Sequence, residues 1–293
     1  MKILKKNKNK LIRDKYGILT IKKIPSIIEL KEYYQNIYWK KKYVKYSKEE
    51  VNSFELDYKL IHYFQNKRKK LKILDIGCGE GFAARYFIKQ GYEYYGTDFS
   101  SDGIKNHQKK FLKKINFLQC DIVNDDFFSD KKFDLIICKN VAEHVINYRK
   151  LLKNINKKLN KNGILAVIVP NEFNKIHMEY MRKNKIKNLE NMPFYFPPDH
   201  IRYFNPQSLK KSIEKNTNIK IQSLMTTFPI ELFMLNKNTD YYKNKKFGKS
   251  AHNLRINFNN LISKSFDENS INLFEGFCKI GIGRQILAIG KKY

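Results

Sequence analysis

The sequence predicts an α/β fold in which helices cover both faces of a mostly parallel, doubly wound sheet. Short apolar runs alternate with amphipathic runs across Leu71–Asn171, and turn glycines follow the first apolar run. Acidic residues stand where several of the later runs end. Strands that alternate with helices in this way are joined by crossovers, which make neighbouring strands parallel.

The first predicted strand is the apolar run Lys72–Gly77, and the helix after it, residues 81–91, ends at Gly91. The further strands that the apolar runs predict are residues 92–98, 115–121, 132–140, 163–171, 219–228 and 284–292. The further helices that amphipathic periodicity predicts are residues 100–112, 148–159 and 205–216, the last with a proline in its first turn.

We expect two regions in this chain of 293 residues. Residues 1–70 are predicted to be a helical extension, with a helix around Ser26–Trp39, and residues 71–293 the main domain. Two connections within that domain, at about 172–199 and 228–280, are longer than ordinary turns and are predicted to be insertions.

The apolar runs and cysteines indicate a cytoplasmic protein. No apolar run approaches the roughly 20 residues that span a bilayer, and no apolar core of a signal peptide follows the basic N-terminus. The four cysteines form no Cys-x-x-Cys pair, so we expect reduced thiols and no metal site.

The net charge of +30 has two readings. It is typical of proteins that bind nucleic acid or anionic membranes. It also follows from a composition rich in Lys, Asn and Ile, as in an AT-rich coding sequence. The lysines form no single stripe, which favours the second reading. We therefore expect no stable nucleic-acid complex, but some attraction of anionic ligands through groups such as Arg202 or Lys139.

A glycine turn between a strand and a helix is typical of nucleotide-binding sites, because glycine lets a ligand approach the backbone closely. Gly77, Gly79 and Gly81 have the spacing G-x-G-x-G. A dinucleotide fingerprint would need its third glycine at Phe82, and the Gly-Lys-Ser/Thr ending of a P-loop is absent.

Acidic residues mark the ends of the next two strands. Asp98 is placed to accept hydrogen bonds from ribose hydroxyls, and Asp121 from the exocyclic amine of adenine. A single aspartate of this kind more often caps a helix or lies in a solvated turn. Asp75, Asp98 and Asp121 occur in order around the glycine turn, which favours a cofactor site at the carboxyl edge of the sheet.

These motifs together resemble those of the class I S-adenosylmethionine-dependent methyltransferases. The segments that carry the resemblance are LDIGCGEG, GTDFS, LQCDI, FDLIICKNVAEHV and GILAVIVPN. The resemblance implies a Rossmann-like sheet of seven strands whose last strand, near residues 284–292, is antiparallel. It also implies S-adenosyl-L-methionine as the cofactor.

The resemblance assigns roles to particular residues. Gly77 to Gly81 are expected to cradle the methionine part of the cofactor, Asp98 to hold the ribose, and Asp121 with Ile122 to flank the adenine. The other positions that the resemblance assigns to cofactor binding are Asp75, Cys78, Phe99, Lys139 and Asn140.

Two histidines are alternative candidates for the base that takes a proton from the methyl acceptor. His144, in the pair Glu143–His144, follows the fourth strand, although both residues could instead cap the next helix or pack against the cofactor. His200 begins a segment that resembles a His-x-x-Tyr-Phe motif on the substrate side, where it could be the base or could orient the substrate. Ubiquinone-pathway members carry an acid three residues before the Glu, where Asn140 stands here, which argues against a metal-assisted catechol mechanism.

The predicted activity is O-methylation of a sugar, a sugar-nucleotide or another small molecule. The segment Ile18–Trp39 resembles a lead-in of bacterial glycan-cluster methyltransferases and suggests surface-glycan biosynthesis. An RNA methyltransferase, which the net charge favours, is the alternative. A non-catalytic protein with this fold is a third reading, which the intact glycine turn and acidic strand ends argue against. A homodimer is compatible with these patterns.

Overall fold

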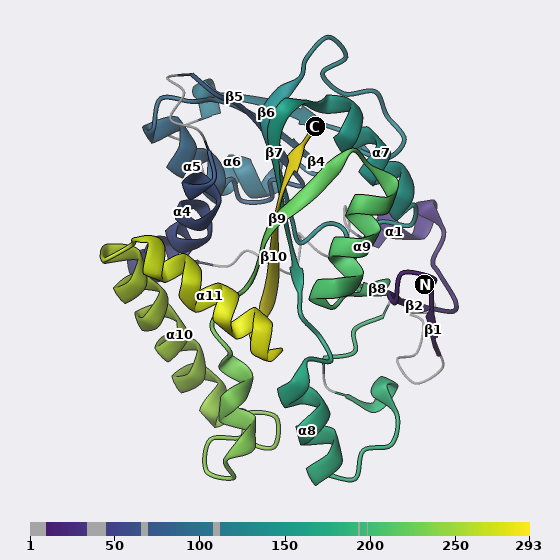
Figure 1. Cartoon of the computed structure of the whole chain (residues 1–293), viewed down its shortest axis with the longest axis vertical. Helices are drawn as coiled ribbons and strands as arrows, with labels where there is room; N and C mark the ends of the chain where they lie inside the picture. Colours follow the sequence, from purple (N-terminus) through teal and green to yellow (C-terminus); the bar gives the residue numbers. More distant parts are fainter. Residues whose placement is uncertain (1–9, 34–44, 66–69, 108–111, 193, 198) are drawn as a thin grey trace.

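The computed structural model describes residues 10–33, 45–65, 70–107, 112–192, 194–197 and 199–293 (Figure 1). Its centre is a seven-stranded sheet in the order β5-β4-β3-β6-β7-β10-β9. The strands are β3 (Lys72–Ile76), β4 (Glu93–Asp98), β5 (Ile115–Gln119), β6 (Phe133–Lys139), β7 (Leu159–Pro170), β9 (Ile219–Thr226) and β10 (Gln285–Lys292). Only β10 runs against its neighbours in this sheet, β7 and β9. The predicted fold, with its last strand antiparallel, is confirmed.

Both faces of the sheet are buried, which explains why its strands are continuous apolar runs. Successive side chains of a strand point to opposite faces. Accordingly, Leu74 packs in the cluster with α7 (Tyr148–Lys158) and α9 (Pro206–Asn216), and its neighbour Ile73 packs in the other. The helices that contribute to the second cluster are α4 (Glu55–Tyr63), α5 (Phe82–Lys89), α6 (Asp102–His107), α10 (Lys246–Lys264) and α11 (Glu268–Ile280).

Two predicted boundaries differ from the structure by more than two residues. The helix expected at residues 100–112 is α6, which ends at His107; residues 108–111 lie outside the described part, and a 3₁₀ turn, η3 (Leu112–Lys114), follows them. The fifth strand of the sheet begins at Leu159 rather than Gly163, because Leu159 pairs with Phe133 before a register shift. A bulge of this kind is hard to read from the apolar pattern.

The expectation that residues 1–70 are helical was incomplete. The helices α1 (Ile27–Tyr33), α3 (Lys48–Ser53) and α4 are present, and the rest of the expected helix, residues 34–39, lies outside the described residues. Before them, β1 (Leu11–Arg13) and β2 (Leu19–Ile21) form a hairpin that pairs with β8 (Arg202–Tyr203). Local hydrogen bonds stabilise the hairpin turn, since Asp14 Oδ1 accepts the N–H groups of Tyr16 and Ile18.

The two long connections contain further helices. Residues 172–199 hold α8 (Lys175–Lys183) and η4 (Leu189–Asn191), and residues 228–280 hold η5 (Ile230–Leu235), α10 and α11. Figure 1 shows α8 and the lower end of α10 below the sheet, on the side where the parallel strands end. Within the described parts of the chain, none of the helices is both long and apolar enough to cross a bilayer.

Candidate active site

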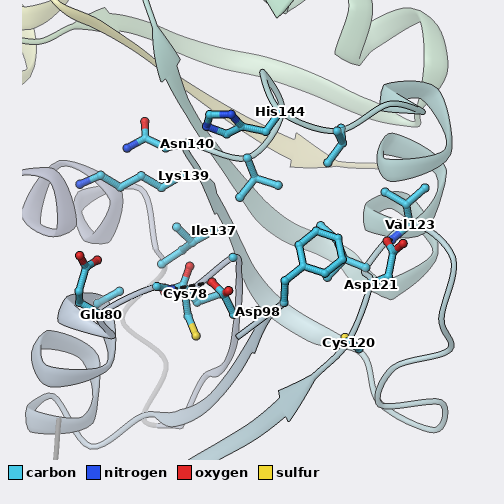
Figure 2. A pocket seen from close by; sticks show the side chains of 18 of the residues that line it. Cys78, Glu80, Asp98, Cys120, Asp121, Val123, Ile137, Lys139, Asn140 and His144 are labelled. Atoms are coloured by element: carbon cyan, nitrogen blue, oxygen red, sulfur yellow. Dashed lines mark hydrogen bonds between the residues drawn. The ribbon is translucent and has the colours of Figure 1, made fainter. Parts of the chain in front are cut away.

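A cavity of about 520 Å³ opens at the carboxyl ends of the parallel strands (Figure 2). Strand ends meet at one edge of a parallel sheet, so residues far apart in the sequence converge there. Of the eleven positions assigned to the cofactor, ten line this cofactor cavity: Asp75, Gly77, Cys78, Gly79, Asp98, Phe99, Asp121, Ile122, Lys139 and Asn140. The eleventh, Gly81, instead begins α5 as its N-cap.

The glycine turn has a backbone that other residues adopt only with strain. Gly77, Gly79 and Gly81 have φ values of +67°, +51° and +68°, in the left-handed region. A Cβ atom on Gly77 would also lie 2.3 Å from Cγ2 of Val141. Val141 therefore packs directly against Gly77, and the contact of the turn with the methionine part of the cofactor stays a prediction.

Asp98 ties the glycine turn to the end of β4. Its Oδ2 accepts the N–H of Gly79 at 3.0 Å, and its Oδ1 accepts the N–H of Ser100 at 3.1 Å. Burial raises the pKa of Asp98 to about 6, although these N–H groups favour the carboxylate. Each carboxylate oxygen can accept a second hydrogen bond, so Asp98 fits the predicted contact with ribose hydroxyls.

Asp121 and Asp75 also have partners within the protein. Asp121 organises the turn after β5, where its Oδ1 accepts the N–H of Val123 at 2.9 Å. Its contact with adenine stays a prediction. Asp75 accepts the hydroxyl of Tyr94, and burial raises its pKa to about 7. Asp75 therefore helps to fix the floor of the cavity, and burial favours its protonated form.

The N-terminal extension supplies walls of the cavity that the sequence analysis missed. The extension residues that line it are Ile27, Leu30, Tyr46, Phe54 and Tyr58. Tyr46 donates a hydrogen bond to Glu80 Oε1 at 3.1 Å, and its ring packs edge-on against Phe82. The one local signal was the spacing of Phe54 and Tyr58, four residues apart. That spacing shows that the two share a helix face but not which surface that face covers.

The structure brings the two candidate histidines together. The ring centroids of His144 and His200 are 5.0 Å apart, and Glu143 Oε1 is 3.6 Å from His144 Nε2. Of these three residues, only His144 lines the cofactor cavity, where Figure 2 shows it beside Asn140. Glu143 is 1% exposed and lies behind the cavity wall. His144 and His200 are thus neighbours in one cluster rather than alternatives in separate places.

The hydrogen bond of His144 assigns its neutral tautomer. Its Nδ1 lies 2.6 Å from the backbone carbonyl oxygen of Asp199, which can only accept, so Nδ1 carries the proton. The lone pair of neutral His144 is then on Nε2. This is the state in which an imidazole can accept a proton during catalysis.

His200 has a different environment. Its Nδ1 is 2.8 Å from Glu172 Oε1. Burial opposes the charge on His200, but Glu172, with Glu143 and Asp199, outweighs burial and raises the pKa of His200 to about 9. Burial also raises the pKa of Glu143 to about 8, although His200 opposes this shift. These shifts favour the charged form of His200, held by Glu172, and the protonated form of Glu143.

The sequence analysis expected no metal site here, but the cluster holds a set of atoms of the kind that binds metal ions. Glu143, His144 and His200 each offer a ligand-type atom, and these atoms lie within 4.8 Å of one another. With no cation bound, the raised pKa values of Glu143 and His200 favour the protonated form of each group. Both protons would have to leave before the three groups could bind a cation together.

Arg202 and Lys139 are not available for the anionic ligand that we expected them to attract. The guanidinium of Arg202 donates to the carbonyl groups of Val145 and Ile146. Lys139 Nζ lies 2.6 Å from Asp57 Oδ2, which joins the end of β6 to α4. Arg202 therefore holds the loop after β6 in place, and Lys139 holds the extension against the sheet.

The chain belongs to the methyltransferase domain family, whose family model matches residues 49–222. It is an S-adenosylmethionine-dependent class I methyltransferase. The ubiquinone biosynthesis O-methyltransferase of Rickettsia typhi is 29% identical over 187 residues, which cover 59% of this chain and 71% of that protein. The enzyme of the same name from Rickettsia canadensis is 30% identical over 163 residues, covering 52% and 68%.

Solved structures share the fold at low sequence identity. The 1,6-didemethyltoxoflavin-N1-methyltransferase of Burkholderia thailandensis, solved with S-adenosylhomocysteine, has a TM-score of 0.51 and 12% identity, covering 94% of each chain. The PH0226 protein of Pyrococcus horikoshii has a TM-score of 0.52 and 15% identity, covering 89% of this chain and 99% of that one.

Proposed function

We propose that this methyltransferase acts on a hydroxyl group of a small molecule and that His144 accepts the hydroxyl proton. Bound S-adenosylmethionine supplies an electrophilic methyl group for transfer to the acceptor oxygen. The observation that carries the role of His144 is its hydrogen bond to the Asp199 carbonyl, which puts the proton on Nδ1 and the lone pair on Nε2 in a residue that lines the cofactor cavity.

Neighbouring groups support the protonated state that His144 reaches in this step. When Nε2 takes the proton, the imidazolium lies near the Asp199 carboxylate, whose Oδ1 is 3.6 Å from Nδ1. A nearby carboxylate stabilises an imidazolium in a partly buried site. His200 is a positioning residue in this proposal, because it is cationic and bonded to Glu172 and does not line the cavity.

The names of the relatives support transfer to oxygen. They concern ubiquinone biosynthesis and give no support to the sugar acceptor that we expected from the sequence. Asn140 also distinguishes this chain from the ubiquinone-pathway pattern. Its Oδ1 accepts a hydrogen bond from Gln285 Nε2 at 2.9 Å, which joins β6 to β10 where an acid would otherwise stand. We therefore propose a small hydroxyl acceptor without a metal-assisted catechol mechanism.

The test is transfer of labelled methyl groups from S-adenosylmethionine to a panel of phenols and sugars, with products identified by NMR. His144→Ala should lower turnover about 10²–10⁴-fold, whereas S-adenosylhomocysteine should bind nearly as in the wild type. His62→Ala is the matched control, since His62 bonds Tyr86 and Tyr92 and does not line the cavity. Full activity of His144→Ala, or methylation at nitrogen, would contradict the proposal.

A further inference from the structure

A second cavity, of about 380 Å³, adjoins the cofactor cavity. The two share the lining residues Phe54, Lys139 and Asn140. Figure 2 shows Lys139 and Asn140 close together beside His144. The second cavity therefore begins at the end of β6, where the candidate base also stands. A molecule in the second cavity would have its reacting end near His144 and its remainder against the insertion of residues 228–280.

Three cations line this second cavity: Lys139, Arg255 and Arg284. The ion pair with Asp57 compensates the positive charge of Lys139. Arg284 Nη1 lies 3.5 Å from Oε1 of the buried Glu231, and Glu172 acts on Arg284 from farther away. Two of the three cations are therefore already compensated by acids of the protein.

Arg255 is the exception. Its Nη2 lies 3.3 Å from Nδ1 of His252. Among the described residues, no carboxylate lies within ion-pair distance of Arg255. The acids that act on it from farther away, Asp57 and Glu50, each already bond another group, Lys139 and His252 respectively. Burial lowers the pKa of Arg255, as expected for a cation that has lost water without gaining an anion.

The remaining lining fits a small organic molecule. Phe228, Tyr241 and Tyr242 provide aromatic walls, and the amide of Asn259 adds a polar group. The amide oxygen of Asn259 is buried and has no hydrogen-bond partner in the described part of the chain, so a donor on a ligand would satisfy it. An arginine fork presents paired donors that match the oxygens of a phosphate or carboxylate.

We propose that the second cavity is the acceptor site and that it selects acceptors carrying an oxyanion, a phosphate or a carboxylate, which Arg255 binds. This assignment rests on the methyl-transfer function proposed above and adds the class of acceptor to it. Arg284, which lines the same cavity, adds a second positive charge. The hydroxyl to be methylated lies at the other end of the acceptor, near Asn140 and His144.

The test measures binding rather than turnover, so it stands apart from the role of His144. Inorganic phosphate, benzoate and the neutral benzamide are titrated by calorimetry into the enzyme saturated with S-adenosylhomocysteine. Phosphate or benzoate should bind, benzamide should bind at least tenfold more weakly than benzoate, and Arg255→Gln should weaken the anion at least tenfold. Which anion binds more tightly distinguishes a phosphate-bearing acceptor from a carboxylate-bearing one.

Lys249→Gln is the matched control. It removes one exposed positive charge from the same helix, α10, and should leave anion binding unchanged. Arg284→Gln should also weaken anion binding, and it replaces Arg255→Gln in the test if that variant does not fold. Equal weakening by Lys249→Gln would mean that the net charge alone attracts anions, and no binding of either anion to the wild type would also overturn the proposal. Failure of methyl transfer with anion binding intact would count against the role of His144 only.

Discussion

Replacing Gly77 with Ala should lower the stability of this protein more than the same change at Gly91 does. Two costs combine at this position. The φ of +67° costs about 1–2 kcal/mol for a residue with a Cβ atom. Placing that atom 2.3 Å from Val141 Cγ2 forces a shift in a packed region, which costs about 1–3 kcal/mol. Together they predict a loss of about 2–5 kcal/mol in the free energy of unfolding.

Two other glycines separate these costs. Gly91 has a φ of +84° and open space around its Cβ position, so Gly91→Ala should show the backbone cost alone, about 1–2 kcal/mol. Gly276 lies within α11 with open space and ordinary φ, so Gly276→Ala should be stabilising by about 0.5–1 kcal/mol. Urea unfolding of the three variants measures these differences directly.

The double variant Gly77→Ala/Val141→Ala tests the clash itself. Removing the methyl groups of Val141 should recover the packing cost but not the backbone cost, which gives a coupling free energy of about 1–3 kcal/mol in a double-mutant cycle. S-adenosylhomocysteine affinity should fall in Gly77→Ala and recover in part in the double variant, because Val141 lines the cofactor cavity. A Gly77→Ala that loses no more stability than Gly91→Ala, or a coupling near zero, would refute the reasoning.

Two further predictions concern charge. Burial raises the pKa of Asp98 to about 6, and the cofactor ribose binds the ionised form, so S-adenosylhomocysteine affinity should fall about tenfold from pH 7 to pH 5. Asp98→Ala should lose about 1–3 kcal/mol of affinity at pH 7 and should flatten this pH profile. A variant with an unchanged pH profile would exclude Asp98 as the source of the pH dependence. Asp57→Asn should lower stability by about 1–3 kcal/mol, since it breaks a partly buried ion pair. It should also strengthen benzoate binding in calorimetry, because it frees Lys139. Benzoate binding that does not become stronger would show that Lys139 does not face the anion.

The sequence predicted the part of this molecule that local patterns determine. Buried strands, the turn glycines and the acids at strand ends are short-range features, and parallel topology alone brings the strand ends to one edge. That is why ten of the eleven cofactor positions line one cavity, although the N-cap role of Gly81 was not foreseen. The β1–β2 hairpin was missed because its partner, β8, lies about 180 residues away in the chain.

The site beyond the cofactor depends on contacts that no local pattern encodes. His144 and His200 were separate candidates because 56 positions divide them, and only packing places their rings 5.0 Å apart. The environment then gives them different roles, since Asp199 fixes the tautomer of His144 and Glu172 keeps His200 charged. Arg255 belongs to a long insertion, where its residue type alone carried no signal of a site.

The distribution of charge around the two cavities also explains why the net charge of +30 was a poor guide to the ligand. The acids that line the cofactor cavity include Asp75, Glu80, Asp98 and Asp121, and Lys139 is its single lining lysine or arginine in the described residues. The second cavity has the opposite balance, with Arg255 and Arg284 added to the Lys139–Asp57 pair. The sign of the local charge therefore changes across the boundary at Lys139 and Asn140. A sulfonium cofactor is cationic and suits the acidic side, so an acceptor of opposite charge suits the basic side, and each cavity disfavours the other's ligand.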